Sequence, residues 1–214
     1  MCCFRLNSLS MNKTILVIFF AFFISHTHAQ NPRTYSGSNF TFSVYTHGGA
    51  SADDVCSVDS IVVIAKNGPK YIQSIVPGEN SYTCNTVNDA LTVEDMNFDG
   101  FEDFRIVQFT GTPNTPYFFW LYDPKSKKFK KSVELEDITS PVFDQKNKTI
   151  TSDWTDNAAH HGTTIRKYIK GRLTKTKEID KSADPKDSNY MIVTTRELIA
   201  GKWKVVSRSK SKWD

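Results

Sequence analysis

The sequence predicts an all-β protein of about ten short antiparallel strands, arranged as a sandwich, a barrel or a propeller-like stack of sheets. Three observations support this prediction. Beyond residue 30, apolar residues alternate with polar ones or gather in short β-branched runs, and almost no stretch repeats them at helical spacing. Turn residues separate the runs at intervals typical of antiparallel sheets. Aromatic residues make up 13% of the chain and can fill the space between such sheets.

The first 29 residues are expected to be a signal peptide and not part of this fold. Ten apolar residues run through 15–24, too few to span a bilayer but typical of the apolar core of a signal peptide. Lys13 precedes the run, and small residues precede an expected cleavage after Ala29. The alternatives are a buried segment or a membrane anchor. We expect translation to start at Met11 and the mature chain, with no membrane span, to be periplasmic or secreted.

The mature chain, 30–214, is treated as a single all-β domain, and its first predicted strands each end at a turn signal. The segment 39–46 alternates apolar and polar residues, as a half-buried strand does. The runs 60–66 and 70–76 flank Asn-Gly-Pro at 67–69, which indicates a hairpin. Further strands are predicted at 104–109 and 117–122, the latter with the sequence YFFWLY.

The second half of the chain continues in the same way. A turn at 123–128 with proline in its second position leads to a predicted strand at 129–135. Two more hairpins are predicted from their turn residues, Lys170-Gly171 and the IAGK segment. Their strands are 165–169 with 173–179, and 190–198 with 203–208.

Charge and cysteine content narrow the class of protein. The formal charge of +4 falls to 25 − 23 = +2 once Arg5 and Lys13 leave with the signal peptide, which does not suggest a nucleic-acid-binding protein. Cys56 and Cys84 remain in the mature chain, and in an oxidising compartment we expect them to form a disulfide. Such a bridge would stabilise the fold by roughly 3 kcal/mol. Two free buried thiols are the alternative.

Residues 95–103, DMNFDGFED, predict a calcium-binding loop of the EF-hand type. Oxygen donors recur at alternate positions, and a glycine at the sixth position allows a sharp turn. The predicted ligands are the side chains of Asp95, Asn97, Asp99 and Asp103 and the backbone carbonyl of Phe101.

The loop departs from the EF-hand pattern at its twelfth position, where Ile106 replaces the usual glutamate. The flanking segments also predict strands and not helices. The remaining ligands would have to come from Glu94, Glu102, a water or a distant carbonyl. We therefore expect weak binding, with a dissociation constant on the order of 1 mM, and a structural role for Ca²⁺. A polar turn with solvated acids is the alternative.

Residues 95–103 look like the calcium loops of FG-GAP and VCBS β-propeller repeats. A longer set of segments, DMNFDGFEDFRIV, GTPNTPYFFWLYDPKSKKF, PVFDQKNKTITS and YIKGRLTK, resembles a family of small exported bacterial proteins. That family includes periplasmic immunity proteins that inhibit lysozyme-like effectors of type IV secretion systems. The resemblance covers about 93–175. It implies an incomplete β-propeller-like fold with one EF-hand-like calcium loop, and a lysozyme-like peptidoglycan hydrolase or secreted effector as the partner.

A lysozyme inhibitor of this kind would insert a loop into the active site of the hydrolase. The segment 152–168 is the candidate, because its donors could meet the two catalytic carboxylates of the enzyme. The candidate residues are His160, His161, Arg166 and Tyr168. An ordinary solvated hairpin loop is an equally good interpretation of this segment.

No catalytic framework stands out, so the chain is predicted not to be an enzyme. Adjacent His160 and His161 would point apart on a strand and do not form a zinc motif. The YFFWLY segment is better explained as a buried strand than as a platform for sugars. The alternative function is a calcium-stabilised, FG-GAP-like module for adhesion or cell-wall glycan binding, and a hydrolase with an unrecognised site is the third hypothesis.

Overall fold

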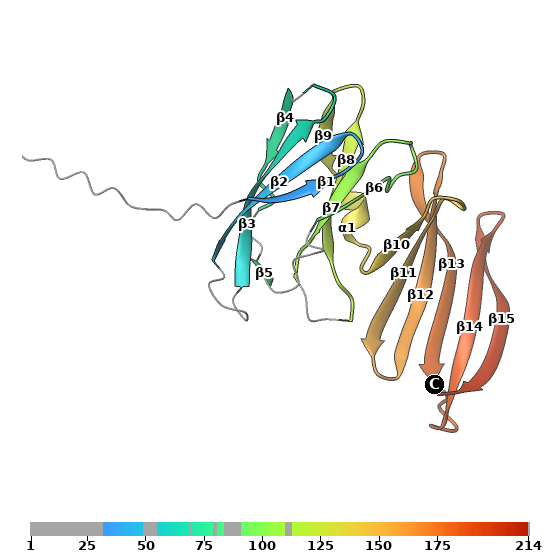
Figure 1. Cartoon of the computed structure of the whole chain (residues 1–214). Coiled ribbons are helices and arrows are strands. Elements are labelled where there is room, and N and C mark those ends of the chain that lie inside the picture. Colours follow the sequence, from blue (N-terminus) through green and yellow to red (C-terminus); the bar gives the residue numbers. More distant parts are fainter. Residues whose placement is uncertain are drawn as a thin grey trace, which may run out of the picture.

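The computed structural model describes residues 32–48, 55–68, 70–78, 81–83, 91–109 and 113–213. In these ranges the chain forms fifteen strands and one helical turn, which make three antiparallel sheets in series (Figure 1). The predicted signal peptide and Cys84 lie outside the described residues, and only the backbone of Cys56, in β3, is described. No helix in the described part has the length and hydropathy to cross a bilayer.

The N-terminal sheet has the strand order β1-β2-β3-β4, with β5 paired to β3. The alternation predicted for 39–46 is present in β2, where Phe40, Phe42 and Val44 are buried and the intervening residues are partly exposed. The strands of this sheet are β1 (Arg33–Ser36), β2 (Phe40–Gly48), β3 (Val55–Ala65), β4 (Lys70–Ile75) and β5 (Ser81–Thr83).

The central sheet has the order β6-β7-β8-β9 and is followed by a single helical turn, α1 (Val133–Glu136). Strand β8 buries Phe118, Phe119 and Trp120, so the YFFWLY segment is the buried strand that the sequence predicted. The strands of this sheet are β6 (Leu91–Glu94), β7 (Asp103–Val107), β8 (Tyr117–Asp123) and β9 (Lys128–Lys131).

The C-terminal sheet is a six-stranded meander in which each strand pairs with the next along the chain. Its last strand, β15, lies at the edge of the sheet, and every residue of β15 is exposed. The strands of this sheet are β10 (Pro141–Asp144), β11 (Thr149–Asn157), β12 (His160–Ile169), β13 (Arg172–Ala183), β14 (Tyr190–Ile199) and β15 (Lys202–Lys212).

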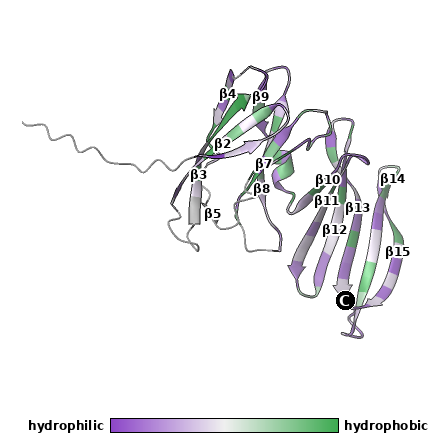
Figure 2. Cartoon of the chain, in the orientation of Figure 1, coloured by the Kyte–Doolittle hydropathy of each residue, from purple (hydrophilic) through white to green (hydrophobic). Residues whose placement is uncertain are grey.

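An aromatic core joins the N-terminal and central sheets. The ring of Phe104 is fully buried, 5.0 Å from the ring of Phe42 and stacked on Trp120 at 5.0 Å. The Gln73 side chain of β4 donates to the Phe129 carbonyl of β9 (3.1 Å) and accepts from the Phe129 amide (2.9 Å). One side chain thus continues the strand-pairing pattern between the two sheets. In Figure 2, hydrophobic residues are seen on the strands of both sheets.

A second, smaller core joins the central and C-terminal sheets, and Arg105 crosses this joint. Met96, Phe119, Leu135 and Ile150 are fully buried in it. The Arg105 guanidinium pairs with Glu94 (3.1 Å), donates to the Pro141 carbonyl (3.1 Å) and lies 4.7 Å from the centre of the Tyr117 ring. Burial lowers the pKa of Arg105, an effect that the charge of Glu94 partly offsets. The Arg105 guanidinium therefore holds β7 against β10.

The prediction of an all-β fold is confirmed, and the sheets form an open series and not a closed ring. The expected number of strands was too low because β1, β5, β6, β10 and β11 were missed. The predicted strand at 129–135 is wrong in its second half, where 133–136 form α1 and bury Leu135 beneath the central sheet.

Candidate functional site

The carboxylate loop, residues 95–103, connects β6 to β7 and is organised by its own backbone amides. Asp95 accepts hydrogen bonds from the amides of Asp99 (3.1 Å) and Gly100 (2.8 Å). Asn97 donates its side-chain amide to Asp99 Oδ2 at 2.8 Å. Gly100 has a φ of 91°, which a residue with a Cβ rarely adopts. These contacts bring the oxygens of Asp95, Asn97 and Asp99 together.

Asp103, at the other end of the loop, turns toward the protein interior. Its side chain is fully buried and accepts the amides of Met96 (2.8 Å) and Tyr122 (2.8 Å). Desolvation raises the pKa of Asp103 to about 7; these two hydrogen bonds oppose the shift, and the charges of Asp99 and Asp95 add to it. Asp103 therefore ties the loop to β8.

The donor set fits a hard cation only in part. Asp95, Asn97 and Asp99 offer hard oxygens and the Phe101 carbonyl is a fourth candidate, fewer than the roughly six to eight that Ca²⁺ takes. In the described ranges, no three or more His, Cys, Asp or Glu side chains lie close enough to hold a metal ion. An ion here would need water to complete its shell.

Glu102 clamps the loop to the N-terminal sheet, so it is not the missing ligand of a metal ion in the loop. Its carboxylate accepts the backbone amides of Ser38 and Asn39 (2.8 Å for Asn39), which lie between β1 and β2. These hydrogen bonds lower the pKa of Glu102 despite the opposing effect of burial. A Cβ at Gly37 would lie 2.7 Å from Glu102 Oε2, so glycine allows this close approach. Glu94, the other suggested ligand, is paired with Arg105.

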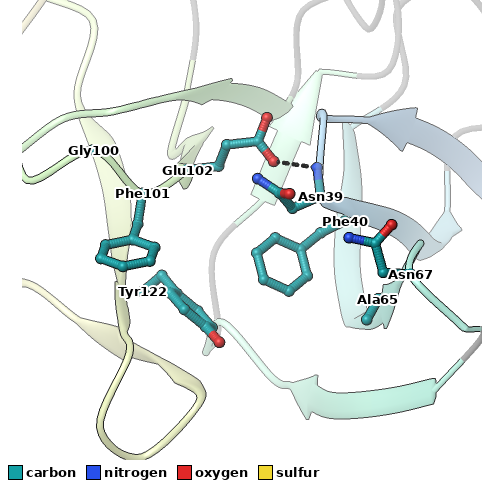
Figure 3. Close-up of a pocket in the computed structure, with 8 residues that line it drawn as sticks. All are labelled: Asn39, Phe40, Ala65, Asn67, Gly100, Phe101, Glu102 and Tyr122. Atoms are coloured by element: carbon teal, nitrogen blue, oxygen red, sulfur yellow. Dashed lines mark hydrogen bonds between the residues drawn. The ribbon is translucent and has the colours of Figure 1, made fainter.

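A pocket of about 340 Å³ lies beside this clamp and is drawn in Figure 3. Its aromatic side is a row of rings: Phe101 lies 5.7 Å from Tyr122, and Tyr122 lies 5.0 Å from Phe40. The side-chain amides of Asn39 and Asn67 lie on the other side of Phe40. Gly100, Phe101 and Glu102 belong to the carboxylate loop, so the loop forms one wall. We call this the Phe101–Tyr122 pocket.

The segment predicted to be an inhibitory loop is instead the hairpin of β11 and β12, with a turn at Ala158 and Ala159. Near this turn, the His160 imidazole lies between Asp180 (Nε2–Oδ2 3.1 Å) and Asp156 (Nδ1–Oδ2 3.3 Å), with its ring 5.1 Å from Trp154. Hydrogen bonds to Asp180 and Asp156 raise the pKa of His160. The carboxylates of Asp156 and Asp180 make this end of the hairpin a poor match for the acidic active site of a hydrolase.

The other two residues of the predicted loop lie away from the turn. Arg166 and Tyr168 are partly buried where β12 approaches α1, and Tyr168 packs on the second core. Burial is the main cause that raises the pKa of Tyr168, and it lowers the pKa of Arg166. The structure therefore separates Arg166 and Tyr168 from His160 and His161, and the four do not form one protruding surface.

The exposed edge strand β15 presents a basic face. Strand pairing matches Trp203 with Leu198, Val205 with Arg196 and Arg208 with Thr194, after a bulge between Thr195 and Arg196. Because paired residues share a face, the bulge brings one set of β15 side chains to the same side. We call this set the β15 basic face, and it consists of Trp203, Val205, Arg208, Lys210 and Lys212.

This basic face has little internal charge compensation. Lys210 pairs with Asp184 at 2.7 Å. Within the described residues, neither Arg208 nor Lys212 has an ion-pair partner, and β15 itself contains no acidic residue. Trp203 is 45% exposed and Val205 is 60% exposed. The strand therefore combines apolar surface, positive charge and a free edge.

The sequence indicated neither the Phe101–Tyr122 pocket nor the β15 basic face. Asn39, Asn67 and Tyr122 come from three separate parts of the chain, and no local motif connects them. For β15, the sequence predicted a strand over 203–208 only, whereas β15 continues through the basic SRSKSK segment to Lys212. Continuing the alternation of residues 203–208 through this segment would have extended the strand.

The comparisons with known proteins support the fold. No family model matches the chain, and no curated protein matches it. The structure is similar to that of a Xanthomonas protein described as related to a type IV secretion system. The TM-score is 0.60 and the sequence identity 19%, over 84% of this chain and 98% of that one. At this identity the similarity shows a shared fold.

Proposed function

We propose that the chain is an exported, calcium-binding protein that inhibits a lysozyme-like peptidoglycan hydrolase and has no catalytic activity of its own. The observation that carries this proposal is the similarity in fold to a protein related to a type IV secretion system, over nearly the whole of that protein. The hydrolase follows from the resemblance of 93–175 to the inhibitor family.

The role of calcium in this proposal is structural. An ion held by Asp95, Asn97 and Asp99 would offset the repulsion between neighbouring carboxylates at the joint between β6 and β7. Through Glu102 and Asp103, the same loop is attached to the N-terminal sheet and to β8. Calcium would therefore stabilise the two N-terminal sheets as a unit.

The surface that fits such a partner best is the β15 basic face, which replaces the hairpin in the proposed mechanism. Lysozyme-like active sites carry two carboxyl groups in a cleft. Arg208 and Lys212 offer positive charge that no described residue pairs with, and Trp203 offers an exposed ring that can be buried in a complex. Docking of this face over an acidic cleft would exclude the glycan.

An inhibition assay tests the proposal. The mature chain, 30–214, is titrated in calcium against lysozymes and against lysozyme-like effectors of type IV secretion systems, with lysis of peptidoglycan as the readout. We expect at least one hydrolase to lose activity at a stoichiometric ratio. Full activity of every hydrolase at excess inhibitor would contradict the proposal.

A further inference from the structure

We propose that the Phe101–Tyr122 pocket is a binding site for a neutral saccharide. This goes beyond inhibition of a hydrolase, since a sugar could bind here in the absence of any enzyme. The volume of about 340 Å³ is at the small end of the ligand-pocket range of about 300–1,000 Å³. It suits one or two sugar rings.

The polar groups in the pocket are free to bind a ligand. In the described part of the chain, no hydrogen bond involves the side-chain amides of Asn39 and Asn67 or the hydroxyl of Tyr122. Each amide provides two N–H donors and a carbonyl acceptor, and the hydroxyl can do both. Sugar hydroxyls also donate and accept, so these groups match them.

The aromatic row provides the apolar half of the site. Phe101 is 40% exposed although it lies beside the buried Phe40 and the partly buried Tyr122. The faces of such rings carry partial negative charge and attract the C–H groups of a sugar ring. Rings on one side and amides on the other thus match the two chemical characters of a saccharide (Figure 3).

The charge around the pocket disfavours anionic ligands, which are the main competing class. None of the described residues that line the pocket is Lys or Arg. The nearby Lys66 lowers the pKa of Glu102 and donates to the Gly37 carbonyl, while the carboxylates of Asp95 and Asp99 add negative charge beside Gly100. A phosphorylated or carboxylated ligand would be repelled unless a cation intervened. The Glu102 carboxylate is already engaged by Ser38 and Asn39, so it fixes the wall of the pocket.

Nuclear magnetic resonance of the ¹⁵N-labelled mature chain tests the inference with no hydrolase present, so its failure and that of the inhibitor proposal are separable. We expect diacetylchitobiose or cellobiose to shift the side-chain NH₂ signals of Asn39 and Asn67, with a dissociation constant on the order of 1 mM. Phe101→Ala should weaken binding about fivefold. Asn67→Ala should also weaken it. Phe109→Ala, which removes a similarly exposed ring outside the pocket, should leave binding unchanged.

Three outcomes would overturn the inference. The first is the absence of shifts with any neutral saccharide. The second is a set of shifts confined to another part of the molecule, such as the β15 basic face. The third is equal loss of binding in Phe101→Ala and Phe109→Ala while the remaining backbone signals show an intact fold. Equally tight binding of glucose 6-phosphate would contradict the exclusion of anions.

Discussion

Strands β2 and β15 lie at opposite ends of the molecule and bury very different amounts of surface. Strand β2 places Phe40, Phe42 and Val44 in the aromatic core, at 7%, 0% and 4% exposure. Strand β15 is exposed throughout, and within the described residues its Arg208 and Lys212 have no ion-pair partner. The difference indicates a division of labour: the two N-terminal sheets hold the fold, and the edge of the C-terminal sheet is available to a partner.

The largest expected effect is on stability, and it tests this division directly. Phe104→Ala removes a fully buried ring that contacts Phe42 and Trp120, and should lower the free energy of unfolding by about 3–5 kcal/mol. Trp203→Ala on β15 should change it by about 0.5 kcal/mol or less. Denaturant unfolding of both variants provides the comparison, and similar losses would mean that β15 also supports the core.

Charge reversal on β15 tests whether this strand binds the partner. Arg208→Glu combined with Lys212→Glu should weaken inhibition of the hydrolase about 30-fold, since each charge contributes about 1 kcal/mol near the surface. Lys125→Glu with Lys146→Glu changes the net charge equally at two exposed turns and should have little effect. If both pairs behave alike, the basic residues of β15 only protect a free strand edge from mispairing.

Removal of calcium should lower the stability of the N-terminal sheets. With a dissociation constant on the order of 1 mM, about 10 mM calcium would stabilise the fold by about 1.4 kcal/mol. Asp99→Ala should therefore lower the melting temperature in calcium and have much less effect in a chelator. Thermal unfolding in both buffers measures this, and equal losses would show that the loop contributes through its hydrogen bonds and not through an ion.

The smallest expected effect concerns pH and the C-terminal sheet. The groups that face His160 are Asp156, Trp154 and Asp180, and the two carboxylates raise its pKa in the folded state. The stabilisation is therefore complete below the unfolded pKa of about 6.5 and is lost as pH rises through the higher folded value. Melting temperatures of wild type and Asp180→Asn across this range should converge at high pH. A constant difference would exclude the His160 charge as the cause.

Strands with a buried face were easier to predict from the sequence than exposed strands. Strand β2 was predictable because a sheet covered on one face requires apolar and polar residues to alternate. The Lys170-Gly171 turn was predictable from its glycine, because both residues of this turn adopt positive φ. Strand β11 and the first half of β12 were mistaken for a loop, because exposed strands can be polar. The sequence indicated candidate site residues only where they are close together along the chain, as in 95–103. Glu102 and Ser38 are 64 residues apart, and no pattern in the sequence relates them.

Affinity capture with the mature chain, 30–214, in calcium tests the central claim most directly. The bait is presented with an extract containing periplasmic proteins and secreted effectors, and the activity of each captured protein on peptidoglycan is measured with and without added inhibitor. The account predicts capture of a peptidoglycan hydrolase that the chain inactivates, and loss of that capture with Arg208→Glu and Lys212→Glu. Capture of peptidoglycan fragments without a hydrolase, or of a hydrolase that stays fully active, would contradict it.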